Sequence, residues 1–298
     1  MTQMLPMRKA YGEALLALGH ARPDVVALSA DVLNSDFSYM FADAFPDRFF
    51  NVGIAEQSLV DVAAGLAYSG KVPFANTFAF LFATRALEMI RTHLCYGEAN
   101  VKLMAAYSGI SDSFDGPTHH AISDVAIMRS LPKMTIVVPS DTVAVAKLLP
   151  QVADWAGPVY FRMNRNEVPL IFDESYAPQI GRAMPLRDGR DLTLICNGML
   201  VARCLEAADR LADDGISAAV LEMHTVKPLD LEAVVNAARA TGALVTADCC
   251  PVPVKRVGLA DRFAETGPYP AILDRYGMSV DHVVAAARAA VDAKKRGE

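Results

Sequence analysis

Three segments of the sequence carry polar or aromatic side chains where an enzyme could use them. In Asn51–Gln57, Glu56 follows a short apolar run and stands at the first turn of an apolar helix pattern. Thr77–Phe82 is rich in aromatics that could stack on a flat heterocycle, and it follows the apolar run Val72–Ala75. Gly109–His120 holds two acids and two histidines, a composition too polar for a buried core.

Each segment also has an ordinary structural explanation. An acid such as Glu56 stabilises a helix simply by standing near its N-terminus. Aromatics after a strand usually belong to the core, and residues 77–82 taken alone favour that interpretation. The loop 109–120 favours function. Because adjacent histidines point in different directions, we expect only one of His119 and His120 to face a site.

Apolar strands alternate with amphipathic helices along the first half of the chain. This alternation predicts a mostly parallel sheet with helices on both faces. Ligands of such sheets bind beyond the carboxyl ends of the strands, so the loops that follow strands are the places to look for function. The predicted strands are Val25–Ala30, Phe49–Val52, Val72–Ala75, Val101–Ala106, Thr135–Val138 and Val159–Arg162, and the predicted helices are Arg8–Leu18, Glu56–Tyr68, Ala83–Cys95, Ser123–Ser130 and Thr142–Val152.

A linker and a second α/β domain follow. Pro169–Asp191 is rich in proline, glycine and charge, so we place the boundary near residue 180, with domains 1–180 and 181–298. Parallel neighbours need a crossover of about a dozen residues. Since only residues 247–253 join the strands at 243–246 and 254–257, we expect these two not to be parallel neighbours, or one not to be a strand. The second domain's predicted strands are Leu192–Cys196, Ala218–Leu221, Ala243–Thr246 and Val254–Val257, and its helices are Val201–Asp213, Leu231–Ala238 and Val280–Ala293.

Composition excludes several classes of function. The 298 residues carry a net charge of -6, which gives no field to attract nucleic acid or an anionic membrane. No apolar run is long enough for a membrane span, and no signal peptide is recognisable. The five cysteines form no metal-ligand pattern, which favours a reduced cytoplasmic compartment. Cys249 and Cys250 could form a redox pair, but adjacent cysteines more often fill small buried positions.

Taken in order, the motifs resemble the pyrimidine-binding and C-terminal domains of transketolases. The resemblance extends over nearly the whole chain. Each motif is weak by itself, but the ordered set is specific. It rests on Gly53-Ile54-Ala55-Glu56, Thr77-Phe78, Asp115-Gly116-Pro117-Thr118-His119, Arg129-Ser130-Leu131-Pro132, Pro139-Ser140-Asp141, Thr225-Val226-Lys227-Pro228-Leu229-Asp230 and Asp261-Arg262-Phe263-Ala264-Glu265-Thr266-Gly267.

The resemblance implies a thiamine diphosphate site. Glu56 matches the acid that hydrogen-bonds the cofactor's aminopyrimidine, which allows a proton to leave the thiazolium carbon. Phe78 matches the aromatic that stacks on the pyrimidine, and the second aromatic of the family falls at Leu81 or Phe82. Asp31 matches an acid beside the cofactor.

The resemblance also implies a sugar substrate. Asp115 and His119 match residues that contact the hydroxyls of a ketose donor, and His119 is counted with Glu56 as catalytic. Transketolases that act on phosphorylated sugars have a phosphate clamp at the outer end of the channel. Its matching positions are Arg8, Ser35, Tyr107 and Arg162. Two features depart from the family: Tyr107 stands where histidine is usual, and Ser113-Phe114 stands where many members have Gly-Glu.

A partner chain is implied by what the sequence lacks. The family holds the cofactor's diphosphate through Mg²⁺ with a Gly-Asp-Gly segment and a later Asn, and no segment here fits. The resemblance therefore implies an N-terminal transketolase subunit that binds the diphosphate and Mg²⁺. We expect an active site between the two subunits, an inactive isolated chain, and self-association into a heterotetramer.

The leading hypothesis is a transketolase subunit that moves a two-carbon ketol unit from a phosphorylated ketose to an aldose. Three alternatives stay open: the beta subunit of a 2-oxoacid dehydrogenase's decarboxylase component, the C-terminal half of a deoxyxylulose-phosphate-synthase-like enzyme, and a non-catalytic assembly subunit. The motif 115–119 favours the first hypothesis, because a dehydrogenase subunit has no donor hydroxyls to contact.

Overall fold

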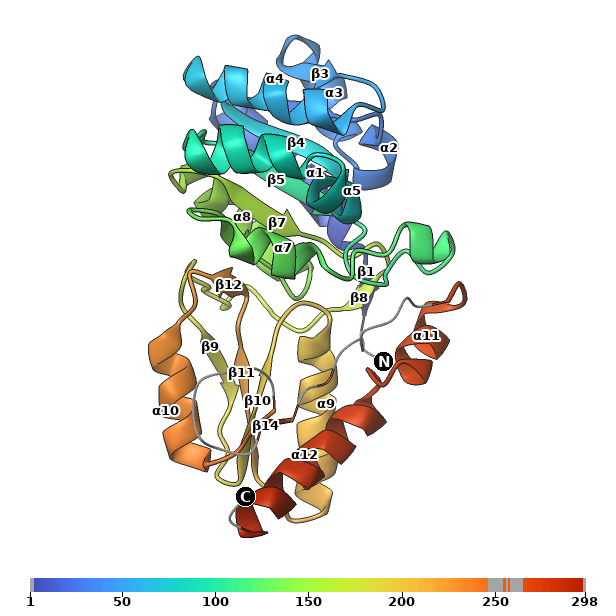
Figure 1. Cartoon of the computed structure of the whole chain (residues 1–298), viewed down its shortest axis with the longest axis vertical. Helices are drawn as coiled ribbons and strands as arrows, with labels where there is room; N and C mark the ends of the chain where they lie inside the picture. Colours follow the sequence, from blue (N-terminus) through green and yellow to red (C-terminus); the bar gives the residue numbers. More distant parts are fainter. Residues whose placement is uncertain (1–2, 246–253, 256, 258–264, 297–298) are drawn as a thin grey trace.

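Two α/β sheets lie one above the other along the long axis of the molecule (Figure 1). The structure is a computed structural model, and it describes the chain except residues 1–2, 246–253, 256, 258–264 and 297–298. The upper sheet, coloured blue to green, comes mainly from the first half of the chain. The lower sheet, yellow to red, comes from the second half. The domain division at residue 180 stays a prediction.

The first sheet has seven strands in the order β12-β6-β7-β5-β4-β2-β3, all parallel except β12. Helices cover both faces. On one face, α1 and α8 bury residues such as Tyr11, Leu15 and Leu148. On the other, α4 and α5 bury residues such as Leu59 and Phe82. The elements are β2 (Val25–Ser29), β3 (Phe49–Asn51), β4 (Val72–Phe78), β5 (Lys102–Ala106), β6 (Thr135–Val137), β7 (Val159–Arg162), α1 (Met7–Ala21), α4 (Glu56–Tyr68), α5 (Ala79–Thr84), α7 (Asp124–Ser130) and α8 (Thr142–Asp154).

The second sheet has five strands in the order β14-β13-β10-β11-β9, and only β9 is antiparallel to its neighbour. Helices α9 and α12 pack on one face, and α10 packs on the other. The predicted α/β class, with two mostly parallel sheets covered on both faces, is confirmed. The elements are β9 (Met184–Arg187), β10 (Leu192–Cys196), β11 (Ala218–Glu222), β13 (Leu244–Val245), β14 (Val254–Lys255), α9 (Leu200–Asp213), α10 (Leu231–Thr241) and α12 (Val280–Arg296).

Short elements complete the described chain. In Figure 1, α11 lies apart from the second sheet, beside the long loop that extends from the first. These elements are β1 (Met4–Leu5), β8 (Val168–Pro169), α2 (Leu33–Asp36), α3 (Tyr39–Ala44), η1 (Pro46–Arg48), α6 (Leu87–Met89), the π-helix η2 (Ile90–Tyr96), η3 (Gly116–Thr118) and α11 (Tyr269–Arg275).

One strand ties the two halves together. Strand β12 (Thr225–Lys227) follows β11 of the second sheet but pairs antiparallel with β6 of the first sheet. The Nζ of Lys227 also donates a hydrogen bond to the carbonyl of Arg129, 3.0 Å away. This strand is one of the motifs on which the family resemblance rests, and its role here is structural.

Polar side chains fill the interface between the two sheets, which we name the joint. Its main residues are Ser140, Asp141, Tyr176 and Glu222. Asp141 caps α8 by accepting a hydrogen bond from the Ala144 N–H, and its second oxygen accepts from the N–H groups of Ile171 and Phe172. Glu222, at the end of β11, accepts hydrogen bonds from the hydroxyls of Ser140 and Tyr176. Burial raises the pKa of Glu222 to about 7.

Three sequence expectations need correction. β13 and β14 are parallel neighbours, with Leu244 opposite Val254. Each strand pairs over only two residues, Leu244–Val245 and Val254–Lys255. β4 continues through Phe78. The helix expected at 83–95 is divided between α5, α6 and the π-helix η2.

Two further expectations concern the adjacent cysteines and the membrane. The possible redox pair Cys249-Cys250 lies outside the described residues. Across the described part of the chain, no helix has both the length and the apolar character that crossing a bilayer requires.

Candidate active site

The loops at the carboxyl ends of β2, β3, β4 and β5 form one edge of the first sheet, because these strands are parallel neighbours. Most sequence-predicted site residues stand on this edge. Asp31 and Tyr107 follow β2 and β5, and both adopt left-handed backbone conformations with φ of 61°. A non-glycine residue held in that region typically costs about 1–3 kcal/mol, and such strain gathers at functional sites.

Glu56 is the first residue of α4, and its side chain is only 1% exposed. Its Oε2 accepts a hydrogen bond of 2.8 Å from Nη1 of Arg85, whose own side chain is 48% exposed. The N-terminal end of the helix favours a negative charge at this position. The structure therefore supplies a buried carboxylate that is held by one partner from the solvent side.

A small network fixes the loop that leads to Glu56. The side-chain amide of Asn51 donates to Oδ1 of Asp31 at 3.0 Å. The side-chain carbonyl oxygen of Asn51 accepts from the backbone N–H groups of Asp31 (3.1 Å) and Gly53 (3.0 Å). Gly53 has a φ of 73°, which a side chain would strain. Asp31 is exposed, so it holds this loop in shape while remaining accessible.

Aromatic side chains gather beside the acid loop. Phe78, at the end of β4, stacks on Tyr107 with ring centroids 4.3 Å apart and planes 9° apart. His119 meets Phe80 edge-on at 5.2 Å and lies 6.3 Å from Phe78. Phe80 was not among the residues expected from the sequence, although it stands two residues after Phe78 on the same aromatic run. His120 is buried while His119 is half-buried, as expected for adjacent residues.

Leu81 and Phe82 are not brought to this edge. Phe82 is fully buried in the core on the α4 side of the sheet, and Leu81 is 8% exposed. Both lie on α5, which begins directly after Phe78. The helix turns these two side chains inward, so the ordinary core explanation of the aromatic run holds for them.

A group of four residues, which we name the tail group, surrounds the hydroxyl end of Tyr107: Arg8, Ser35, Tyr107 and Arg165. Arg8 donates from Nη1 to the Ser35 carbonyl and, at 3.4 Å, to the Tyr107 hydroxyl. The guanidinium carbons of Arg8 and Arg165 lie 5.1 and 5.0 Å from the Tyr107 ring centroid. Three of the four clamp positions expected from the sequence are therefore together.

Arg165 was not among the residues expected from the sequence. It stands three residues beyond Arg162, in the loop after β7 rather than in the strand itself. It forms a salt bridge with Asp112 and lies 3.7 Å from Asp115. The rule that ligands meet the loops after strands would have pointed to this residue.

The loop 109–120 packs against the second half of the chain. A hydrogen bond of 3.0 Å runs from the Gly267 N–H to the Ser113 carbonyl. A Cβ at Gly116 would come within 1.9 Å of the Thr266 hydroxyl, so only glycine fits there. Asp112 is fully buried, and burial raises its pKa to about 6. The exposed Asp115 and the half-buried His119 remain accessible on this loop.

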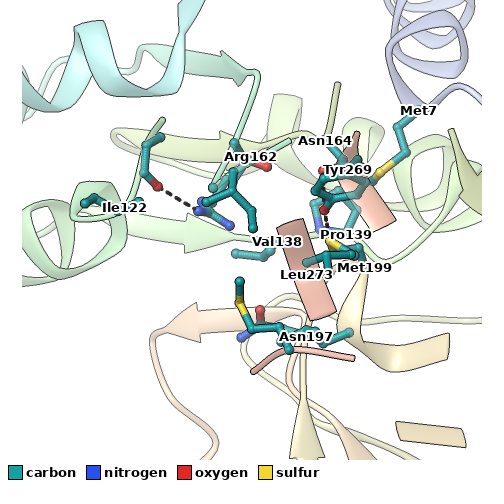
Figure 2. Close-up of a pocket in the computed structure, with 17 residues that line it drawn as sticks. Met7, Ile122, Val138, Pro139, Arg162, Asn164, Asn197, Met199, Tyr269 and Leu273 are labelled. Carbon is teal, nitrogen blue, oxygen red and sulfur yellow. Dashed lines mark hydrogen bonds between the residues drawn. The ribbon is translucent and has the colours of Figure 1, made fainter. Parts of the chain in front are cut away.

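Arg162 stands apart from the tail group. Its guanidinium holds Asp124 with two hydrogen bonds of 2.7 and 3.2 Å and also donates to the Ala121 carbonyl. It lines a cavity of about 210 Å³ between the two sheets, and Figure 2 shows it facing this space together with Val138 and Asn197. The structure therefore does not bring Arg162 to Arg8, Ser35 or Tyr107.

The edge fits the pyrimidine end of thiamine diphosphate. It offers a buried carboxylate for a ring nitrogen and an aromatic ring, Phe78, for a flat heterocycle. The buried Thr77 hydroxyl at the end of β4 has no hydrogen-bond partner and could serve a polar ligand. Among the described residues, no three His, Cys, Asp or Glu side chains gather in a way that could hold a metal ion.

Two family models match the chain, one in each half. Residues 3–170 match the family model of the transketolase pyrimidine-binding domain. Residues 181–248 match the model of the transketolase C-terminal domain.

Curated relatives include single subunits and full-length enzymes. The chain is 36% identical to the 6-deoxy-6-sulfo-D-fructose transketolase subunit SqwH of a Clostridium species, over 97% of this chain and 95% of the relative. It is 34% identical to one subunit of the apulose-4-phosphate transketolase of Phocaeicola vulgatus, over 94% and 96%. It is 40% identical to the transketolase of Mus musculus over 81% of this chain, but only 39% of that longer enzyme is covered.

Solved structures of transketolases have the same fold as this chain. A chain described as a split gene transketolase, inactive beta4 tetramer, superposes with a TM-score of 0.90 at 42% identity and covers 97% of this chain and 99% of its own length. The transketolase of Leishmania mexicana superposes with a TM-score of 0.82 at 21% identity, which concerns the fold alone.

Proposed function

The chain belongs to the transketolase family, and we propose that it is the C-terminal subunit of a two-chain, thiamine-diphosphate-dependent transketolase. In this proposal the enzyme transfers a two-carbon ketol unit from a ketose to an aldose. The observation that carries the proposal is Glu56, a buried carboxylate at the first turn of α4, on the same sheet edge as the aromatic Phe78.

Glu56 would accept a hydrogen bond from the protonated ring nitrogen of the aminopyrimidine. When bound, the cofactor supplies a carbon nucleophile that attacks the ketose carbonyl. The task of this chain is to hold the pyrimidine and its proton: Glu56 stabilises the protonated ring nitrogen, and burial strengthens that electrostatic interaction. Phe78 would support the ring by stacking, and Asp31 would keep the loop before Glu56 in place.

The substrate would enter over the loop 109–120. His119 and Asp115 are the accessible polar side chains of that loop, suited to the hydroxyls of a ketose. The tail group would receive the far end of the sugar. Both relatives whose substrate is named act on a sugar with an anionic end, a sulfonate in one and a phosphate in the other, which supports an anion at this place. We leave Arg162 out of this contact set because Asp124 already occupies its guanidinium.

A second chain would complete the site. We propose that an N-terminal transketolase subunit holds the diphosphate and Mg²⁺ and that two copies of each subunit form a heterotetramer. The similar split-gene transketolase, described as an inactive beta4 tetramer, supports both self-association and the need for a partner.

The experiment is reconstitution with the N-terminal subunit. The complex, with thiamine diphosphate and Mg²⁺, should transfer a ketol unit within a panel of ketose donors and aldose acceptors, while each subunit alone should be inactive. Transfer by this chain alone would contradict the proposal. Decarboxylation of a 2-oxoacid by the complex, without ketol transfer, would assign it to the dehydrogenase class instead.

A further inference from the structure

The charges around the tail group nearly cancel. Two cations, Arg8 and Arg165, face three acids, Asp36, Asp112 and Asp115. Tyr107 stands among these five residues and adds a hydroxyl group, which can donate a hydrogen bond. A binding site for a doubly charged anion would need an excess of positive charge, and these residues do not provide one.

Arg165 adds no net positive charge to the tail group, because two acids lie beside its guanidinium. Its Nη1 forms a salt bridge with Oδ1 of Asp112, a carboxylate that is fully buried. The same Nη1 lies 3.7 Å from Oδ2 of Asp115. Because the buried partner cannot be reached by solvent cations, the positive charge of Arg165 is neutralised inside the protein. Its remaining N–H groups can still donate hydrogen bonds to a ligand.

Arg8 is the cation that remains. Among the described residues it forms no salt bridge, and the acceptors of its hydrogen bonds are the Arg165 and Ser35 carbonyls and the Tyr107 hydroxyl. The acid on its other side, Asp36, is fully buried and accepts a hydrogen bond from the Ser38 N–H. Burial also raises the pKa of Asp36 to about 6, so part of its charge is lost in mildly acidic solution.

We propose that the tail group selects a donor whose far end carries one negative charge, such as a sulfonate, over the dianion of a phosphate ester. Arg8 balances the single charge, and the Tyr107 hydroxyl and the Arg165 guanidinium donate neutral or already balanced hydrogen bonds to it. A second negative charge would meet Asp112 and Asp115 without a cation of its own. Tyr107 is then a specificity-determining residue, since a histidine there could add positive charge. The inference rests on the proposed transketolase function.

The test uses two donors with the same carbon skeleton, D-fructose 6-phosphate and 6-deoxy-6-sulfo-D-fructose, with the reconstituted two-chain enzyme. Each is assayed as a donor and as an inhibitor of the best donor of the panel. At about pH 7.5 we expect kcat/KM to favour the sulfonate by about tenfold or more, because phosphate esters are then mostly dianions. Between about pH 7.5 and 5.5 that ratio should fall by about 20-fold, since the second pKa of a phosphate ester is about 6. Burial raises the pKa of Asp36 and of Asp112 to about 6, so these acids lose charge over the same range, and this lowers the ratio in the same direction.

Variants at Tyr107 separate charge from shape. Tyr107→His should lower the sulfonate preference by about fivefold, and more below pH 6.5, as its imidazole takes up a proton. Tyr107→Phe, which is neutral like tyrosine, should keep the ratio within about twofold even if both rates fall.

The possible outcomes test the sulfonate preference and the transketolase function separately. A preference for the phosphate at neutral pH, or a ratio that does not change with pH, would overturn the inference. Failure of both compounds as donors and as inhibitors, in an enzyme that transfers ketol units from uncharged sugars, would do the same. In all these cases the transketolase function stands. If the reconstituted complex transfers no ketol unit from any donor, the proposed function itself fails.

Discussion

Polar side chains are buried both at the edge of the first sheet that carries the loops after β2, β3, β4 and β5 and at the joint between the sheets. The two regions differ in how the hydrogen-bonding groups of these side chains are satisfied. At the joint, both carboxylate oxygens of Glu222 and of Asp141 accept hydrogen bonds from the protein. Around the edge, hydroxyls, carboxyl oxygens and ring nitrogens remain without partners. Of the eight such buried atoms in the described part of the chain, seven belong to Asp36, Ser38, Thr77, Asp112, Ser113 and His120, and only the last, on His224, lies in the joint.

The difference indicates what each region is built for. A buried polar group without a partner typically costs about 1–3 kcal/mol, so a ligand that bonds to these atoms would recover part of that cost. The carboxylates of the joint find their hydrogen-bond partners within the protein, and these contacts hold the two sheets together. We therefore expect changes at the edge to alter activity more than stability, and changes at the joint to do the opposite.

The largest effect is expected at Glu56. Glu56→Gln keeps the shape of the side chain and its contact with Arg85 but removes the carboxylate, so kcat of the reconstituted complex should fall by about 10³-fold. The matched control is Asp61→Asn, an exposed acid on the same helix, which should change kcat little. Activity of Glu56→Gln near that of the unchanged enzyme would remove Glu56 from the account.

Arg162 should behave as a joint residue. Arg162→Ala leaves Asp124, which is 2% exposed, without its ion-pair partner, and should lower the free energy of unfolding by about 3 kcal/mol in urea titration. The double variant with Asp124→Asn should recover part of that loss. If Arg162→Ala instead keeps its stability and raises KM only for donors with an anionic end, Arg162 belongs to the edge, as the sequence expectation had it.

Glu222 gives the joint a pH dependence. Its pKa in the folded protein is raised from 4.5 to about 7 by burial, so the folded state binds the proton more tightly than the unfolded chain does. The stability that this provides is complete below about pH 4.5 and is lost as the pH rises through 7. Relative to Glu222→Gln, the unchanged protein should lose at most about 3 kcal/mol over that range. A constant difference in the unfolding free energy between the two proteins would contradict this assignment.

Arg165→Lys should produce the smallest change, and at the edge. Lysine can keep the ion pair with Asp112 but loses the planar, two-pronged donor, so KM for anionic donors should rise by about tenfold with little change in kcat. Stability should move by less than about 1 kcal/mol. Arg162→Lys is the matched control. If it raised KM for anionic donors more than Arg165→Lys does, Arg162 and not Arg165 would belong to the substrate site.

The sequence predicted the strands and helices that carry the edge because their apolar patterns are strong. Glu56 begins its helix at the expected residue, since the polar-to-apolar transition at residues 51–60 leaves little choice. The orientation of Leu81 and Phe82 was not predictable, because it depends on a helix that starts immediately after a strand. The pairing of β12 with the first sheet and the ion pairs of Arg162 and Arg165 are contacts between distant segments, on which local patterns carry no information.

Exchange of the thiazolium C2 proton of thiamine diphosphate for deuterium, followed by NMR after rapid quenching, reports directly on the role of Glu56. The reconstituted complex should accelerate this exchange strongly over free cofactor. Glu56→Gln in the same complex should remove most of the acceleration while leaving cofactor binding detectable. Exchange that is unaffected by Glu56→Gln, or that is accelerated by this chain without its partner, would contradict the account.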